Sequence, residues 1–195
     1  MPDKPCGLIP IIPPALQAEW AANLAEFLAR FRPAALILRD PPAEHAMRII
    51  RDAKPFELAV LFIDDVDGAM EAGATGVYFS APGAGLSKAR SALGSASVLG
   101  VACSLSRHAA MESAEEGADF VAFDASNPSN QTEATEISSW WDDITGVPSA
   151  LVLGAVLPDV SVLSKARPDF VMIEEADRAG ESLTFATEFG LQSQT

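Results

Sequence analysis

Short apolar runs alternate along this chain with stretches in which apolar residues recur at helical spacing. Residues 58–63, 120–123 and 170–173 are apolar throughout, and each run ends at an acidic residue. An uninterrupted apolar run of this length is typical of a strand that is buried on both faces, as in a parallel sheet covered by helices. The pattern therefore predicts a parallel sheet whose strands end in polar side chains.

The alternation repeats along the whole chain. We predict strands at residues 7–12, 34–39, 58–63, 76–79, 98–103, 120–123, 150–153 and 170–173, with helices near residues 16–31, 46–53, 66–72, 86–93, 107–116, 137–144, 160–166 and 183–191. Eight β/α units are the count of a (β/α)8 TIM barrel. The alternative is a doubly wound open sheet, which usually has a Gly-rich turn after the first strand, where this chain has Pro13 and Pro14. We therefore expect one compact TIM-barrel domain over residues 1–195.

The second helix shows how the spacing assigns a buried face. Ala46, Met47, Ile50 and Ala53 recur at intervals of three or four residues or adjoin one another. Apolar residues at such intervals fall on one side of a helix. We expect this side to pack against the barrel.

The net charge and the lengths of the apolar runs argue against two classes of partner, nucleic acids and membranes. The 27 acidic and 13 basic residues give a net charge of −14, which argues against nucleic acid as a partner. No apolar run approaches the ~18–20 residues that span a bilayer, so we expect a cytoplasmic protein without a membrane partner. The adjacent Trp140 and Trp141 put at least one indole off the buried helix face, which favours either a homo-oligomer interface or simple packing. Cys6 and Cys103 lie among apolar neighbours and read as buried, reduced thiols.

Chemistry in a TIM barrel is carried by side chains at the carboxyl ends of the strands. The candidates at these ends are Arg39, Asp64, Asp65, Tyr78, Ser104, Asp124, Gly154, Glu174 and Glu175. Carboxylates that converge on one mouth either bind a cation or raise one another's pKa. This pattern predicts a small-molecule site at the C-terminal mouth of the barrel.

Each candidate also has a structural interpretation. Asp64 and Asp65 can bind a metal, or they can cap the helix that follows them. Arg39 can bind a ligand, or it can form an ion pair with Asp40 or Asp64. The acids Asp124, Glu174 and Glu175 can belong to solvated loops.

Four sequence stretches resemble one family. They are Leu-Phe-Ile-Asp-Asp-Val-Asp-Gly-Ala at 61–69, Glu-Ala-Gly-Ala-Thr-Gly-Val-Tyr-Phe at 71–79, Leu-Gly-Val-Ala-Cys-Ser at 99–104 and Glu-Glu-Gly-Ala-Asp-Phe-Val-Ala-Phe at 115–123. With their spacing, over roughly residues 34–176, they resemble the thiamine phosphate synthase family and its thiazole tautomerase relatives, which are TIM barrels. The resemblance implies a transferase of thiamine biosynthesis.

The resemblance also implies roles for particular residues. Synthases of the family displace pyrophosphate from a pyrimidine diphosphate with a thiazole phosphate, and magnesium holds the leaving group. Asp65 resembles the metal-binding aspartate of the family, with Asp64 beside it, and Arg39 resembles the arginine of its Gln-x-Arg-x-Lys motif. Magnesium is therefore the expected cofactor, and Arg39 and Asp65 are the expected catalytic residues.

Other positions depart from the family pattern. Residues 80–83 lack the second metal-binding aspartate, while Tyr78 and Ser104 each stand where the family has histidine. Gly154 keeps one of two paired glycines, and Glu174 and Glu175 replace the Val-Ser of a phosphate-binding turn. We therefore expect a thiamine phosphate synthase-like protein that has diverged from, or lost, the synthase reaction. The alternative is a non-catalytic barrel, a pseudoenzyme, that binds a neutral or cationic small molecule or a partner protein at its acidic mouth.

Overall fold

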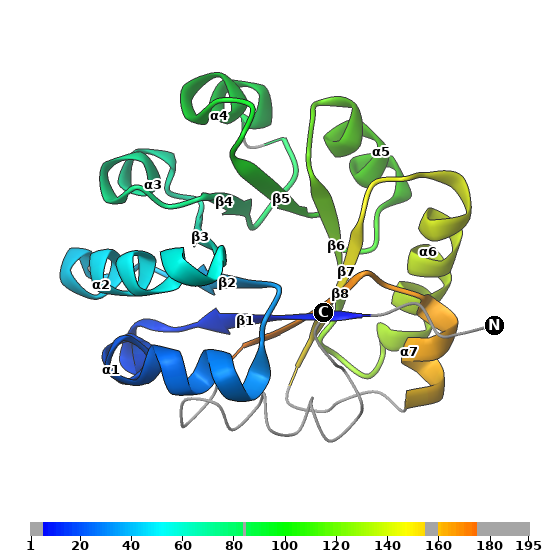
Figure 1. The fold of residues 1–195 in the computed structure, drawn as a ribbon. Coiled ribbons are helices and arrows are strands. Elements are labelled where there is room, and N and C mark those ends of the chain that lie inside the picture. The colour runs from blue at the N-terminus through cyan, green and yellow to red at the C-terminus, as the bar shows by residue number, and fades with distance from the viewer. Residues whose placement is uncertain (1–5, 84, 155–159, 175–195) are drawn as a thin grey trace.

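Eight parallel strands close into a barrel in which neighbours along the chain are neighbours in the sheet and β8 pairs with β1 (Figure 1). The structure is a computed structural model and describes residues 6–83, 85–154 and 160–174. The strands are β1 (Gly7–Ile12), β2 (Ala35–Leu38), β3 (Ala59–Ile63), β4 (Gly76–Phe79), β5 (Val98–Ala102), β6 (Phe120–Ala125), β7 (Ser149–Leu153) and β8 (Phe170–Glu174). The predicted TIM barrel is confirmed.

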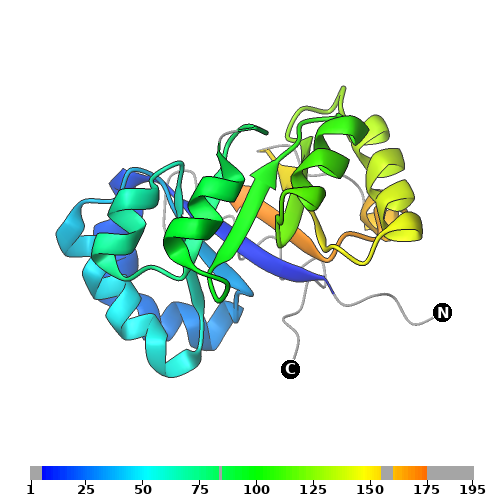
Figure 2. The ribbon, with the colours of Figure 1, turned by 90° about the horizontal axis from the view of Figure 1, so that it is seen from above.

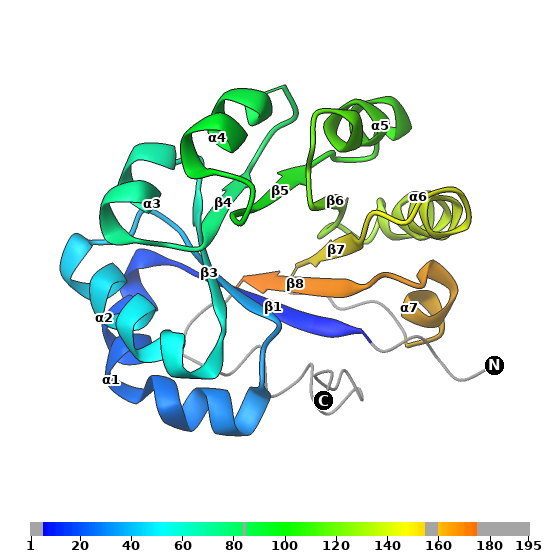
Figure 3. The same cartoon turned by 45° about the horizontal axis from the view of Figure 1, so that its top comes forward.

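Helices surround the strands on the outside of the barrel (Figures 2 and 3). They are α1 (Pro14–Phe31), α2 (Ala43–Ala53), the 3-10 helix η1 (Lys54–Phe56), α3 (Val66–Ala72), α4 (Leu86–Leu93), α5 (Arg107–Glu115), α6 (Gln131–Ile144) and α7 (Val160–Ala166). The helix predicted at residues 183–191 lies outside the described residues. Among the described helices, none combines the length and the apolar character that crossing a membrane requires.

The strands are apolar on both faces because each face meets a different part of the core. In β2, Leu36 and Leu38 pack outward against the helices, whereas Ile37 packs into the barrel interior. Successive side chains of a strand point to opposite faces, so this alternation continues along every strand. It also fixes which residues beyond the strand ends can point into the mouth.

Aromatic rings fill the barrel interior. Tyr78 stacks on Phe120 with ring centroids 6.0 Å apart, and Phe170 meets Phe120 edge-on at 6.1 Å. Gly100 makes room for them, since a Cβ at this position would lie 2.1 Å from the Phe120 ring. Large aromatic residues on some strands, with glycine on a neighbouring strand, thus give a closely packed interior.

Candidate functional site

The alternation of inward-facing and outward-facing side chains continues to the C-terminal ends of the strands. We call this end of the barrel the C-terminal mouth and define it by Arg39, Asp64, Asp65, Tyr78, Asp124 and Glu174. Asp124 pairs with Val152 in the sheet, and Glu174 pairs with Ile11. Val152 and Ile11 both pack in the barrel interior. Because paired residues of adjacent strands face the same way, the side chains of Asp124 and Glu174 stand over that interior.

Arg39 forms an ion pair with Glu174 across the mouth. The Arg39 Nε lies 3.2 Å from Oε1 of Glu174, and Nη2 donates to Oε2 at 3.3 Å. Both side chains are about half exposed, at 40% and 49%. The sequence suggested Asp40 or Asp64 as the acidic partner of Arg39, and the structure places Glu174 of β8 there instead, because β2 and β8 both flank β1.

Gln17 holds the backbone beneath this ion pair, and the sequence analysis missed it. Its side-chain amide, which is fully buried on α1, donates to the carbonyls of Ile12 at 3.1 Å and Arg39 at 2.7 Å. These carbonyls lie at the ends of β1 and β2, and that of Ile12 also accepts a hydrogen bond from the backbone N–H of Arg39 at 3.1 Å. The available signal was a glutamine on the apolar face of a helix that directly follows a strand.

Asp64 turns toward β4 rather than toward the helix that follows it. Its backbone has a positive φ of 54°, and its amide donates to the carbonyl of Tyr78 at 3.1 Å. Its carboxylate accepts hydrogen bonds from the backbone N–H of Ser80, at 2.9 Å, and from the Ser80 hydroxyl. Asp64 therefore links the ends of β3 and β4.

Asp65 is the N-cap of α3. Its Oδ1 accepts a hydrogen bond from the backbone N–H of Gly68 at 2.8 Å, which satisfies a free donor of the first helical turn. A side chain at position 68 would collide with this carboxylate, since its Cβ would lie 2.1 Å from Oδ2. A side chain at position 68 would therefore push the Asp65 carboxylate out of the cap, in which one of its oxygens is engaged.

Asp124 is held by the loop that follows β6. Its Oδ1 accepts from the backbone N–H of Ser126 at 2.9 Å and from the Ser126 hydroxyl at 2.5 Å, and Asn130 approaches Oδ2 at 3.4 Å. Ser104, whose φ is 51°, contributes its carbonyl, which accepts from the Asp124 N–H at 3.1 Å. The ends of β5 and β6 are thereby tied together by backbone rather than by the Ser104 side chain.

Gly154 packs directly against the same loop. A Cβ at this position would lie 2.2 Å from the carbonyl oxygen of Ser126, so the close approach of the two backbones requires glycine. Glu175, the remaining predicted site residue, lies outside the described residues.

Tyr78 forms the floor of the mouth. Its side chain is 5% exposed and packs in the barrel interior. Burial is the largest cause that raises the pKa of its hydroxyl above the usual range, and nearby charges act as well. The charges of Cys103, Asp64 and Asp124 raise the Tyr78 pKa further, and that of Arg39 lowers it. The phenol therefore lies within electrostatic reach of the charged side chains of the mouth and stays protonated at neutral pH.

The described side chains do not assemble a ready metal site. In the part of the chain that the structure covers, no three His, Cys, Asp or Glu side chains are grouped so that they could hold an ion. Asp64, Asp65 and Asp124 each direct oxygens to hydrogen-bond donors of their own loops. Magnesium binding at Asp64 and Asp65 therefore stays a prediction.

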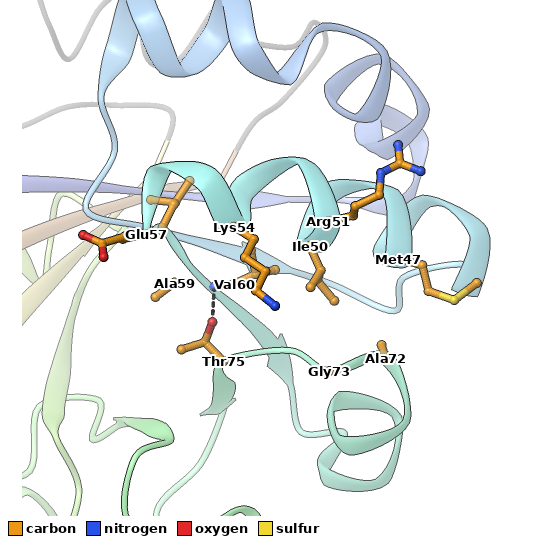
Figure 4. Close-up of a pocket in the computed structure, with 11 residues that line it drawn as sticks. Met47, Ile50, Arg51, Lys54, Glu57, Ala59, Val60, Ala72, Gly73 and Thr75 are labelled. Atoms are coloured by element: carbon orange, nitrogen blue, oxygen red, sulfur yellow. Dashed lines mark hydrogen bonds between the residues drawn. The ribbon is translucent and has the colours of Figure 1, made fainter.

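A separate groove of about 610 Å³ lies at the opposite end of the barrel (Figure 4). It runs between α2 and the connection from α3 to β4, and Lys54 points into it above Thr75. The expectation that Met47 belongs to the buried face of α2 is wrong: Met47 is 55% exposed and lines this groove. The buried face instead carries Ile49 with Ala46 and Ala53, and Met47 faces the groove between α2 and the connection from α3 to β4.

The comparisons with known proteins agree with this architecture. A family model described as "Thiamine monophosphate synthase" matches residues 8–151. A thiamine-phosphate synthase of Rhodospirillum centenum is 32% identical over 180 residues, covering 86% of this chain and 87% of that protein. One of Erythrobacter litoralis is 31% identical over 144 residues, covering 70% and 67%. The chain belongs to the thiamine monophosphate synthase family.

A solved structure shares the fold. The thiamine phosphate pyrophosphorylase from Pyrococcus furiosus superposes with a TM-score of 0.72 at 19% sequence identity, covering 96% of this chain and 94% of that one. At this identity the likeness speaks for the barrel architecture alone.

Proposed function

We propose that this member of the family does not catalyse the synthase reaction and that its mouth binds a small molecule without a phosphate group. The observation that carries the proposal is the Arg39–Glu174 ion pair at the end of β8. In the family this strand leads into a phosphate-binding turn, and here a carboxylate stands over the mouth at that point.

The electrostatics support this assignment. Two unit negative charges about 4 Å apart repel by roughly 4 kcal/mol at an effective dielectric of 20. Arg39 cannot offset this repulsion freely, because its guanidinium already faces the Glu174 carboxylate. A bound phosphate would therefore have to displace that contact or share Arg39 with Glu174.

Because the chain belongs to this family, we further propose that it acts in thiamine metabolism on a changed substrate. The retained features are structural: Asp65 caps α3 and Gly154 packs against Ser126. The features that would serve a diphosphate leaving group are altered, since Ser80 binds Asp64 in the loop where the family has its second metal-binding aspartate.

Calorimetric titration with inorganic pyrophosphate and magnesium tests the proposal. We expect no saturable binding to the wild-type protein below millimolar concentrations. Glu174→Gln, which keeps the shape and removes the charge, should bind pyrophosphate at least about tenfold more tightly than the wild type, given the repulsion estimated above. Micromolar binding of pyrophosphate by the wild type, weakened in Asp65→Asn, would overturn the proposal.

A further inference from the structure

The Tyr78 side chain is largely buried, and its hydroxyl forms no hydrogen bond with another described residue. Tyr78 pairs in the sheet with Ile63 and Gly100, and Ile63 packs in the barrel interior. The tyrosine therefore points into the barrel, with only 5% of its surface exposed. The hydroxyl is not among the fully enclosed polar atoms, so it reaches the mouth, where a ligand can supply the donor or acceptor that such a group normally finds.

The charges around this hydroxyl are predominantly negative. Among the described residues, Asp64 and Asp124 act on the Tyr78 hydroxyl as negative charges and Arg39 acts as a positive one. Glu174 adds a third carboxylate, which faces Arg39. Asp64 and Asp124 form no ion pair with a described lysine or arginine, and serine donors hold both of them. Since an ionised carboxylate can accept about four hydrogen bonds, lone pairs remain on each for a bound donor.

The surface beneath the charges is apolar and aromatic. The Tyr78 ring stacks on Phe120 at an interplanar angle of 8°, and Ile11 and Val152 pack in the same interior cluster. The floor thus suits a ligand with an apolar body and a positive head group.

We infer that the mouth binds an organic ammonium ion on a compact apolar body, with the ammonium N–H groups donating to the Tyr78 hydroxyl oxygen and to the carboxylates of Asp64 and Asp124. This inference rests on the proposed function, because it names the chemical class of ligand for the same mouth. An anionic head group would meet three carboxylates, and a neutral one would leave their charge uncompensated.

Three probes of one shape separate the head-group charges: benzylamine, benzyl alcohol and benzyl phosphate. Tyr78 is the single tyrosine of the chain, so labelling with 13Cζ-tyrosine gives one resonance that reports on the floor of the mouth. Benzylamine should shift this resonance saturably, with a Kd of about 1 mM or below, as expected for so small a ligand. Benzyl alcohol should bind at least about tenfold more weakly, since it lacks the charge-assisted hydrogen bonds.

Three variants then test which residues bind the ammonium group. Tyr78→Phe removes only the hydroxyl, and Asp124→Asn removes only a charge. Each substitution should therefore raise the Kd of benzylamine about fivefold or more by calorimetry and leave the Kd of benzyl alcohol unchanged. Asp52→Asn removes the same unit of charge from α2 at the other end of the barrel and should change neither affinity.

The failures are distinguishable. Equal affinity for benzylamine and benzyl alcohol, or no shift of the Tyr78 resonance with benzylamine, would overturn the ammonium inference and leave the proposed function standing. Tightest binding of benzyl phosphate would overturn both. If Asp52→Asn and Asp124→Asn lowered the affinity for benzylamine equally, the effect would come from net charge, and the assigned site would be overturned.

Discussion

Arg39 at the end of β2 and Glu174 at the end of β8 form an ion pair across the intervening strand β1, with 3.2 Å between Arg39 Nε and Glu174 Oε1. The contact joins the only two strands that flank β1, and it lies where the ligand of a TIM barrel would enter. Its importance is therefore expected in ligand choice more than in stability.

Removing the ion pair should barely change the free energy of unfolding. Both side chains are about half exposed, and exposed pairs typically contribute about 0.2–1 kcal/mol. Gln17→Ala should cost more, about 1–3 kcal/mol, because it removes a buried donor from the Arg39 carbonyl and one of the two donors of the Ile12 carbonyl. Urea unfolding of Glu174→Ala and Gln17→Ala compares the two. A larger loss for Glu174→Ala would mean that the ion pair is a structural element of the barrel.

Asp65 should act as a helix cap whether or not magnesium is present. Asp65→Ala should lower the free energy of unfolding by about 0.5–2 kcal/mol, while Asp65→Asn, which keeps an accepting oxygen, should lose much less. Thermal melts with and without magnesium chloride check this. A saturable magnesium stabilisation of the wild type that Asp65→Asn abolishes would instead establish Asp65 as a metal ligand.

Gly154 should tolerate no side chain. Gly154→Ala places a Cβ 2.2 Å from the Ser126 carbonyl oxygen and should destabilise the protein by about 1–3 kcal/mol, because backbone must move. Gly146→Ala is the matched control, since a Cβ there meets nothing within 4 Å. We expect that variant to be neutral or slightly stabilising by chemical denaturation. Similar losses in the two variants would contradict the close approach of β7 to the loop after β6.

We expect ionisation of Tyr78 to lower the free energy of unfolding at alkaline pH. Burial and neighbouring charges raise the folded-state pKa of Tyr78, so below about pH 10 the hydroxyl is protonated in both the folded and the unfolded state. Above that pH the unfolded state loses the proton first, and the free energy of unfolding falls by up to about 1.4 kcal/mol per pH unit.

Tyr78→Phe removes this proton. The stability difference between wild type and Tyr78→Phe should therefore stay constant from pH 7 to 9 and shift in favour of the variant from pH 10 to 11, as measured by urea unfolding. Cys103, whose pKa burial raises to about 11, is present in both proteins and cancels in the comparison. A difference that stays constant to pH 11 would contradict the buried position of the phenol.

The sequence predicted the barrel well because the signal is physical: strands buried on both faces read as uninterrupted apolar runs. All eight strands fall within a residue or two of the predicted bounds, and β6 runs on to Ala125 because pairing with Leu153 continues past the apolar run. Met47 was misassigned because the apolar spacing within α2 does not report which part of the helix borders a groove.

The site was predictable in outline and not in detail. The alternation within each strand carries residues such as Asp124 and Glu174 into the mouth, so their location follows from the sequence. Their partners do not, because they depend on loop conformation. The positive φ of Asp64 turns its carboxylate to Ser80, and the closure of β8 against β1 brings Glu174 to Arg39.

The most direct test of the central claim is an assay of the synthase reaction itself. Purified protein is incubated with the pyrimidine diphosphate, the thiazole phosphate and magnesium, and thiamine phosphate is quantified against a known synthase of the family. We predict no thiamine phosphate above the rate without protein. Formation of thiamine phosphate at a rate that Asp65→Ala abolishes would contradict the account.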